Sequence, residues 1–414
     1  MELTIRRTFA ALDVRNFRLF LFGQGISLCG TWMQTIGLSW LVLKMTHSGT
    51  ELGLVVAAQF IPILVFGMWG GVIADRFNKR KLLLTTQSLL CILALILGTL
   101  VVFNLIHLWM IFILATCLGL VNVVDNPTRQ SFVIEMVGKK HLRNAISLNS
   151  TLVNMARIIG PSIAGVLIAT SGVGSCFLVN GVSYIAVIIA LYLMHEEELN
   201  PAKTSKMVAG QIRAGLSYIW NEPRLKSTII MMFIIGTFAY EFPVILPLFA
   251  TITLHGTAAT YSAIMVATGI GAILGGLYTA GKSETRESQL VWTAILFGFS
   301  IILASIMPGL YTALIVFVLV GALMIAFLAL GNTTLQLTSD ESMRGRVMAL
   351  WAIAFVGTTP IGGPIIGYIS DHYNPRVGLA VGGISGIVGG LIGLYVYKRS
   401  IARQKKKVTD QILA

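Results

Sequence analysis

The sequence predicts an all-α integral membrane protein in which twelve transmembrane helices form two pseudo-symmetric six-helix bundles. Three observations support this prediction: the composition, the apolar runs and an internal repeat. Of the 414 residues, 56% are hydrophobic and 11% are charged, and the mean hydropathy is +0.83. A soluble domain of this size needs far more charged residues to cover its surface. The composition therefore excludes an ordinary soluble protein.

Apolar runs of about 20 residues recur along the whole chain, and each is long enough to cross about 30 Å of hydrocarbon as a helix. The runs are continuously apolar and do not alternate with period two, which argues against membrane-spanning strands. The twelve predicted helices occupy residues 17–43, 52–74, 82–103, 108–124, 145–170, 175–194, 227–254, 259–280, 290–307, 310–335, 347–369 and 377–397.

The net charge of +13 reflects where the 30 Lys and Arg residues stand between these helices. Nearly all of them fall on one side of the membrane, in segments 6–18, 76–81, 129–143, 203–226, 282–286, 344–346 and 398–407. Lys44 and Arg376 lie on the other side, and Arg157 lies within a helix. The positive-inside rule then places both termini in the cytoplasm of a cell whose inner membrane holds the chain. The basic excess follows from topology and does not indicate nucleic-acid binding.

A polar segment near the middle of the chain divides it into two halves. The predicted organisation is an N-terminal bundle (1–195), a cytoplasmic linker (196–226), a C-terminal bundle (227–398) and a basic cytoplasmic tail (399–414). Within the linker, Val208, Ile212, Leu216 and Ile219 share one helical face, which suits an amphipathic helix on the inner membrane surface.

The two halves repeat one another in order. Gly70-Gly71 at the end of helix 2 matches Gly275-Gly276 at the end of helix 8. Asn126-Pro-Thr-Arg-Gln130 after helix 4 matches Asn332-Thr-Thr-Leu-Gln336 in helix 10, and Gly160-Pro161 with Gly165 matches Gly363-Pro364 with Gly367. Three matches at nearly equal offsets indicate a duplicated six-helix unit with both copies in the same orientation.

A loop motif between helices 2 and 3 makes this organisation more specific. The run Gly71-Val-Ile-Ala-Asp75-Arg76-Phe-Asn78-Lys79-Arg80-Lys81 resembles the signature loop of the major facilitator superfamily, with Asn78 where that family usually has Gly. Asn tolerates left-handed backbone, so we expect the turn to survive. The run Asn154-x-x-Arg157-x-x-Gly160-Pro161 and Arg344-Gly-Arg346-Val resemble the branch that exports macrolides and siderophores.

The resemblance implies a cytoplasmic latch between the halves. Asp75 at the inner end of helix 2 is expected to meet Arg344 or Arg346 at the inner end of helix 11, which stabilises the state closed to the cytoplasm. Asp125 in helix 4 is then expected to accept Arg76 or Arg80 and so hold the loop. The alternative for Asp75 is a solvated loop charge.

Two ionisable residues lie deep in the predicted helices. Glu241, in helix 7, is the candidate proton carrier, because a carboxylate inside the membrane is costly and usually marks an ion or substrate pathway; a static hydrogen-bonded Glu is the alternative. Arg157, in helix 5, could bind an anionic group of a substrate or fasten helix 5 to its neighbours. The sequence leaves these two roles of Arg157 equally open.

Polar side chains follow single faces of several helices and predict a wet central cavity. The resemblance puts helices 1, 4, 7 and 10 around this path. Each polar residue could instead be an interhelical hydrogen-bonding group. The candidates for substrate contact are Gln24, Gln34, Asn122, Asn154, Tyr240, Asn332 and Gln336.

The chain shows none of the short motifs of nucleotide or metal chemistry. It contains no GxxxxGK[ST] and no HExxH, and its four cysteines show no CxxC spacing. We therefore expect no cofactor, no metal and no enzyme activity. The interpretation is a monomeric secondary transporter, a proton-coupled exporter of an amphipathic siderophore or macrolide-like drug working by alternating access. The alternatives are a lysolipid flippase or nutrient importer of the same fold, and a non-transporting receptor or scaffold.

The charge distribution makes a direct prediction about topology. Because the loops near Lys44 and Arg376 are expected outside, cysteines introduced as Ser48→Cys and Asn374→Cys should react with a membrane-impermeant thiol reagent added outside the cell. Protection of both positions from the external reagent would overturn the assignment.

Overall fold

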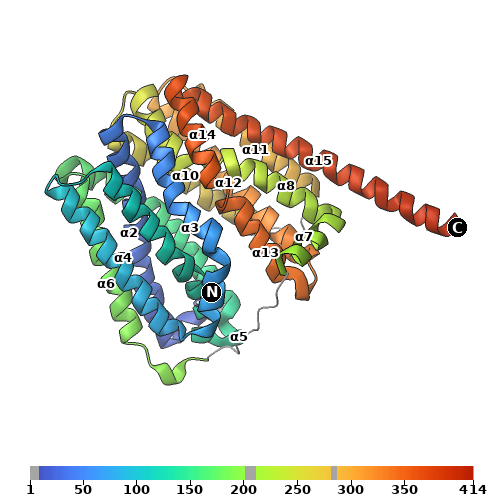
Figure 1. Cartoon of the computed structure of the whole chain (residues 1–414), viewed down its shortest axis with the longest axis horizontal. Coiled ribbons are helices and arrows are strands. Elements are labelled where there is room, and N and C mark those ends of the chain that lie inside the picture. The colour runs from blue at the N-terminus through green and yellow to red at the C-terminus, as the bar shows by residue number, and fades with distance from the viewer. Residues whose placement is uncertain (1–8, 201–210, 281–286, 414) are drawn as a thin grey trace, which may run out of the picture. The chain divides into compact units, whose positions relative to one another are not determined.

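The computed structural model describes residues 9–200, 211–280 and 287–413, and these residues form helices and connecting segments without a strand (Figure 1). The elements are η1 Ala10–Asp13, α2 Arg15–Thr46, α3 Gly49–Arg76, α4 Lys79–Val102, α5 Leu108–Ser171, α6 Gly174–Tyr192, η2 Glu196–Glu198, α7 Gln211–Asn221, α8 Pro223–Phe238, α9 Phe242–Leu248, η3 Phe249–Thr253, α10 Ala258–Ala280, α11 Glu287–Ser305, α12 Leu310–Thr338, α13 Glu341–Val356, α14 Thr359–His372 and α15 Pro375–Leu413.

The predicted all-α membrane fold is confirmed. Within the described residues, eleven helical segments are long and apolar enough to cross a membrane. One of them, the 64-residue α5, contains two helices that meet at Gly138, whose φ of 64° and ψ of 179° are not helical. A straight helix of that length would extend far beyond a bilayer. Counting α5 as two helices gives the twelve predicted spans.

Two predicted helices are broken inside their apolar segments, where the sequence interpretation had them continuous. The segment 227–254 consists of α8, α9 and the π-helical turn η3, with the break at Ala239–Glu241. Pro243 has no N–H to donate to the carbonyl of Ala239, and Pro247 follows one turn later, so the helical ladder is interrupted. The segment 347–369 is likewise divided into α13 and α14, just before Pro360.

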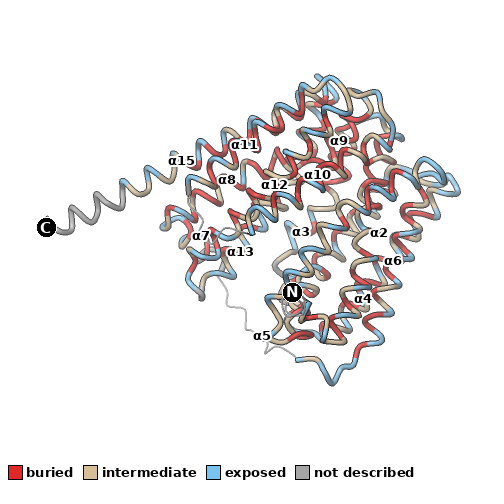
Figure 2. The backbone as a smooth tube through the Cα atoms, turned by 180° about the vertical axis from the view of Figure 1, so that it is seen from behind, coloured by how far each residue is buried: buried red, intermediate tan, exposed pale blue. Residues whose placement is uncertain are grey.

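Contacts group the chain into two compact units. Unit 1 comprises residues 1–47, 55–207 and 256–266, and unit 2 comprises residues 48–54, 208–255 and 267–414. In unit 1, α2 packs on α5 and α6, and α4 packs on α6; in unit 2, α15 packs on α11 and α8. Buried residues follow the packed sides of the helices and exposed residues follow the outer sides (Figure 2). The first turns of α3 and of α10 belong to a different unit from the rest of each helix.

The glycine pairs that revealed the repeat perform the same packing role in both halves. A Cβ atom at Gly70 would lie 1.9 Å from the carbonyl oxygen of Val123, and a Cβ atom at Gly275 would lie 2.1 Å from that of Ala322. Only glycine allows such close approach of two helix backbones. The fifth and eleventh predicted helices correspond too, since Gly165 lies against Ser262 and Gly367 lies against Gly49.

The linker helix has a buried side. In α7, Ile219 is completely buried and Gly215 lies against Arg346 of α13, whereas Leu216 is exposed. Val208, which the predicted amphipathic face included, lies outside the described residues. The apolar face of α7 therefore covers protein at Ile219, because α13 lies beside it.

The loop motif after α3 folds differently from the expected left-handed turn. Asn78 has φ −60° and ψ 115°, and its side chain accepts a hydrogen bond from the backbone N–H of Lys81. This makes Asn78 the N-cap residue of α4, a role in which Asn is among the most favourable residues. The expectation of left-handed backbone at this position is wrong, because the side chain satisfies a free N–H of the helix.

The capping role predicts a definite order of stability among Asn78 variants. Asn78→Asp keeps the acceptor and should leave the thermal unfolding temperature of the purified protein nearly unchanged, whereas Asn78→Ala should lower its stability by about 1 kcal/mol. Asn78→Gly should fall between them. A glycine variant more stable than both would instead indicate left-handed backbone at residue 78.

Candidate functional site

The break between α8 and α9 places a carboxylic acid inside unit 2. Glu241 is the residue before α9, with φ −79° and ψ 37°, and its backbone carbonyl accepts the N–H groups of Val244 and Ile245 at 3.0 Å each. Its side chain is 2% exposed. Among the described residues, its Oε1 atom has no hydrogen-bond partner. A buried carboxylate left in this state would be strongly unfavourable, whereas a protonated carboxyl would not.

The second broken helix provides the surroundings of that carboxyl. Glu241 lies beside the first turn of α14, with Thr359 and Gly362 as neighbours. A Cβ atom at Gly362 would lie 1.6 Å from the carbonyl oxygen of Thr237 and 3.0 Å from Oε1 of Glu241. Gly362 is therefore required for the close approach of α8 and α14. The N–H groups of this turn are used elsewhere, because Pro360 has none and those of Ile361 and Gly362 donate to the carbonyl of Thr358 at 2.9 and 3.0 Å.

Tyr240, next to the carboxyl, fixes the break. Its ring lies 5.4 Å from that of Phe297 and 5.0 Å, edge-on, from that of Phe355, measured between centroids. Its hydroxyl donates to the backbone carbonyl of Met324 in α12 at 2.9 Å. Tyr240 thus ties the irregular segment to α11, α12 and α13, which restricts the position of Glu241.

In unit 1 the predicted cation lies over an aromatic ring. The guanidinium carbon of Arg157 is 5.2 Å from the centroid of Trp32, within the range of a cation–π interaction. Gly160 fixes this geometry, because a Cβ atom there would lie 2.5 Å from Cβ of Trp32 and 2.7 Å from the carbonyl oxygen of Cys29. Both Arg157 and Trp32 are half-buried. A cation–π contact of this kind restricts where the guanidinium group can lie.

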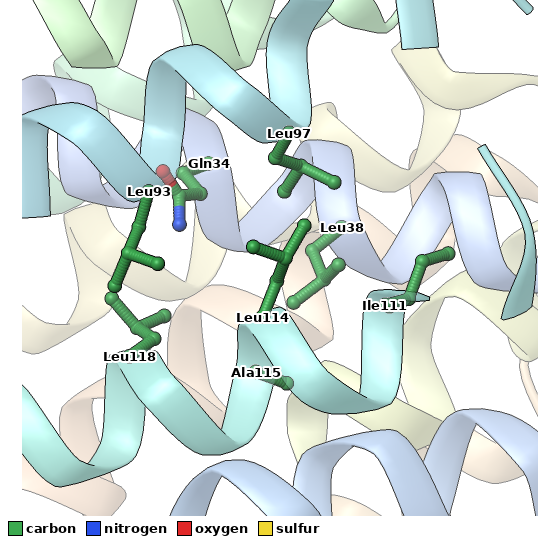
Figure 3. A pocket seen from close by; sticks show the side chains of 8 residues that line it. All are labelled: Gln34, Leu38, Leu93, Leu97, Ile111, Leu114, Ala115 and Leu118. Atoms are coloured by element: carbon green, nitrogen blue, oxygen red, sulfur yellow. The ribbon is translucent and has the colours of Figure 1, made fainter. Parts of the chain in front are cut away.

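Part of the polar face of α2 forms hydrogen bonds to another helix of unit 1. Gln34 is buried and accepts a hydrogen bond from Asn180 of α6 at 2.6 Å, and Gln24 is buried as well. Gln34 also borders a small cavity between α2, α4 and α5, where it is the one polar residue among aliphatic side chains (Figure 3). The cavity measures about 10 Å³, room for about one water molecule. It is too small for an organic substrate.

The other predicted contact residues lie on partly accessible helix faces. Asn122 and Asn154 are half-buried in α5, where the Asn154 side chain donates to the carbonyl of Ser150. Asn332 is half-buried and Gln336 is exposed in α12, and the two side chains hydrogen-bond each other at 2.5 Å. Asn122, Asn154, Asn332 and Gln336 thus lie on helix faces that are at least partly accessible, as expected for the predicted polar faces. Their contact with a substrate stays a prediction.

Asp125 has different partners from those expected. It is completely buried and accepts hydrogen bonds from Oγ1 of Thr86 at 2.7 Å and Nε2 of Gln87 at 2.8 Å, and it forms an ion pair with Arg129. Arg129 lies one turn further along the same helix, where an i,i+4 pair forms readily. These contacts fasten α5 to α4.

The expectation that Asp125 accepts Arg76 or Arg80 is therefore wrong for the described residues. Arg80 forms an ion pair with Glu196 and donates through Nε to the carbonyl of Leu191 at 2.6 Å. That carbonyl is one of the free acceptors at the end of α6, which attract a cation. Arg76 is exposed at the end of α3.

The remaining gating candidates lie at the ends of α3, α12 and α13. Asp75 is exposed in the last turn of α3. Arg344 donates to the carbonyl oxygens of Gln336 and Ser339 and so caps α12, and Arg346 donates to the sulfur of Met343. The proposed latch between Asp75 and these arginines joins the two units and stays a prediction.

Sequence reasoning missed Thr359 and Asn180 as partners of Glu241 and Gln34. Both are common residue types in apolar segments, and no local pattern marks them. Pro243, two residues after Glu241, was the available signal for the break, since proline lacks the N–H of an unbroken helix and favours the first turn of a new one. It would have placed Glu241 near a helix interruption and not in mid-helix.

The broken helices, the two six-helix halves and the buried ionisable group together define a membrane transporter of the major facilitator type. A family model described as a transmembrane secretion effector matches residues 6–412. The chain belongs to that family within the major facilitator superfamily, which confirms the resemblance read from the loop motif. It is a multi-pass membrane transporter.

The curated relatives have similar lengths. The staphyloferrin A transporter of Staphylococcus aureus is 24% identical over 386 residues, covering 92% of this chain and 96% of that protein. The enterobactin exporter EntS of Shigella flexneri is 25% identical over 391 residues, covering 92% and 91%. The multidrug efflux pump Tap of Mycolicibacterium fortuitum is 24% identical over 368 residues, covering 85% and 88%.

Solved structures support the fold. A POT family transporter in complex with a thioalcohol-conjugated peptide superimposes with a TM-score of 0.75 at 13% identity, covering 93% of this chain and 96% of that one. A bacterial homologue of the human lysosomal transporter Spinster gives a TM-score of 0.69 at 15% identity, covering 93% and 97%. At these identities the likeness establishes the fold alone.

Proposed function

We propose that this transporter is a proton-coupled exporter of an amphipathic small molecule, a siderophore or a macrolide-like drug, and that it works by alternating access. The observation that supports proton coupling is the Glu241 side chain, buried at a helix break with one carboxyl oxygen lacking a hydrogen-bond partner among the described residues. In such a site the carboxyl is stable when protonated, and loss of the proton requires water to enter. Proton binding is thereby linked to a change of structure.

A proton suits this site better than a metal cation. A hard cation such as Ca²⁺ or Mg²⁺ takes about six oxygen ligands, more than a single carboxyl supplies. The described residues also contain no group of three or more His, Cys, Asp or Glu side chains that could hold a metal ion. A proton differs from a metal ion because it binds covalently and needs no further oxygen ligands.

Export of a siderophore or drug is the direction that the relatives support. Two of the similar proteins are named for a siderophore and one for multidrug efflux. Arg157 and Trp32 suit a substrate with an anionic group and an apolar body, because they place a cation beside an aromatic ring. The distribution of Lys and Arg supports an inner-membrane location with both termini in the cytoplasm.

Glu241→Gln tests the coupling. Glutamine imitates the protonated carboxyl and carries no exchangeable charge, so the variant should lose efflux driven by a pH gradient and keep measurable substrate binding. Transport would be followed in proteoliposomes with an imposed gradient, supplying a catecholate siderophore, a carboxylate siderophore and a macrolide in separate reactions. Glu222→Gln, in the residue before α8, is the matched control and should transport as the wild type does.

Near wild-type pumping of any of these compounds against its concentration gradient by Glu241→Gln would contradict the assignment. Glu241 would then be a structural residue. A wild-type protein that transports a compound without responding to the pH gradient would exclude proton coupling altogether.

Arg157→Lys tests substrate recognition separately. Lysine keeps the charge but loses the planar guanidinium over Trp32, so the dissociation constant of an anionic substrate should rise about tenfold, while the thermal unfolding temperature stays close to wild type. Binding would be measured by tryptophan fluorescence and by calorimetry. If Arg157 only fastens α5 to α2, the unfolding temperature will fall and the dissociation constant will not change.

A further inference from the structure

The last turn of α14 holds the first turn of α3 through one carboxylate. Asp371 accepts the backbone N–H of Gly49 at 2.6 Å and that of Thr50 at 2.8 Å. It also accepts the hydroxyl groups of Thr50 at 2.7 Å and Ser48 at 2.8 Å. Free N–H groups at a helix start are normally capped from the preceding residues. Here a different helix, far away in sequence, supplies the main cap.

Below this cap the two helix backbones touch. A Cβ atom at Gly53 would lie 2.4 Å from the carbonyl oxygen of Gly363, and one at Gly367 would lie 2.0 Å from that of Gly49. Glycines four residues apart on both helices therefore form one continuous contact. We call the contact of residues 48–54 with α14, including the Asp371 cap, the α3 clasp.

The same helix α14 borders the buried carboxyl. A Cβ atom at Gly363 would lie 3.3 Å from the carbonyl oxygen of Gly53 on one side and 3.4 Å from Oε2 of Glu241 on the other. A single residue without a side chain thus separates the start of α3 from Glu241. Any displacement of the first turn of α14 near Glu241 must alter the α3 clasp, because Gly363 and Asp371 belong to one short helix.

We propose that Asp371 and Gly363 are positioning residues which link the protonation of Glu241 to the α3 clasp, so that the clasp is closed when Glu241 carries a proton and loosens when the proton leaves. The inference rests on the proposed proton coupling. Loss of the proton leaves a buried charge with an unpartnered oxygen, and α14 must shift to let water reach it. The remainder of α3, from Val55 onward, belongs to unit 1, so the continuous helix carries the change from one unit into the other.

The titratable groups of the α3 side are His47, exposed directly before the clasp, and Glu51 within it. Glu241→Gln keeps both, so any pH dependence which that variant loses belongs to Glu241. Thr359, a neighbour of Glu241 in the first turn of α14, carries no charge. The donors that face Asp371 come from Ser48, Gly49 and Thr50 and are also uncharged. The nearby His372 and Arg376 are directed elsewhere, to the carbonyl oxygens of Tyr368 and Ser305.

Amide hydrogen exchange of residues 48–54 tests the link without a substrate. The full-length protein would be placed in lipid nanodiscs and its exchange measured between pH 5 and pH 9, corrected for the intrinsic effect of pH. The wild type should be protected at low pH and should lose protection as pH rises, because the proton binds the clasped state more tightly. Glu241→Gln should keep residues 48–54 protected over the whole range.

Asp371→Asn should act in two ways. Loss of a charged acceptor should speed exchange of residues 48–54 about tenfold or more. It should also move the midpoint of protection to lower pH, since a weakened clasp needs a higher proton concentration to close. Gly363→Ala crowds both neighbours and should move the midpoint in the same direction. The matched controls are Asp340→Asn, at a helix start without a side-chain cap, and Gly67→Ala, whose Cβ atom meets only Ile63 at 4.0 Å.

Three outcomes would overturn the proposal. They are protection that does not depend on pH in the wild type, protection that still follows pH in Glu241→Gln, and an unchanged midpoint in both Asp371→Asn and Gly363→Ala. The last would make Asp371 an ordinary helix cap. Failure of the proposed proton coupling is distinguishable from failure of this link. If Glu241→Gln pumps normally, while protection of residues 48–54 depends on pH in the wild type and not in Glu241→Gln, the proton coupling of transport fails and the link stands.

Discussion

Backbone hydrogen bonding inside hydrocarbon is the constraint on which the rest of this structure depends. A carbonyl or N–H group without a partner costs several kcal/mol there, so spanning segments must be helices and may break only where protein surrounds them. Unit 2 contains two such breaks, at Ala239–Glu241 and between α13 and α14. The two breaks lie against each other, since Gly362 meets the carbonyl of Thr237. The buried carboxyl lies where they meet.

Under the proposed proton coupling, this arrangement would let one acidic residue act on several helices. A carboxyl at a helix break is next to backbone that can rearrange at lower cost than an intact ladder. Around Glu241 every other component is held firmly: Tyr240 by an aromatic pair and a hydrogen bond, and α14 by the cap of Asp371. Proton loss can therefore be relieved mainly by movement of the first turn of α14. The far end of that helix holds α3.

The polar residues of unit 1 show a different use of the same chemistry. Asp125, Thr86, Gln87 and Arg129 form a buried cluster that joins α4 to α5, and Gln34 with Asn180 joins α2 to α6. These bonds between helices suit interhelical cohesion, although Oε1 of Gln87 and Nε of Arg129 have no hydrogen-bond partner among the described residues. The half-buried Arg157 differs from these groups because its guanidinium lies over the ring of Trp32, 5.2 Å from the centroid. Most of the polar residues named in unit 1 therefore join helices to one another, and Arg157 is its candidate for binding a substrate.

The sequence by itself determined the membrane class, the helical spans and the duplicated halves, because apolar length, charge asymmetry and glycine spacing are local or periodic properties. It also pointed to Glu241 as the unusual buried acid. Only the tertiary structure decided the partners: Asn78 as a cap, Arg80 on the end of α6, Asp125 on Arg129, and Asp371 on the start of α3. Such choices depend on which free backbone groups lie within about 3 Å of a side chain after packing, and sequence spacing does not contain that distance.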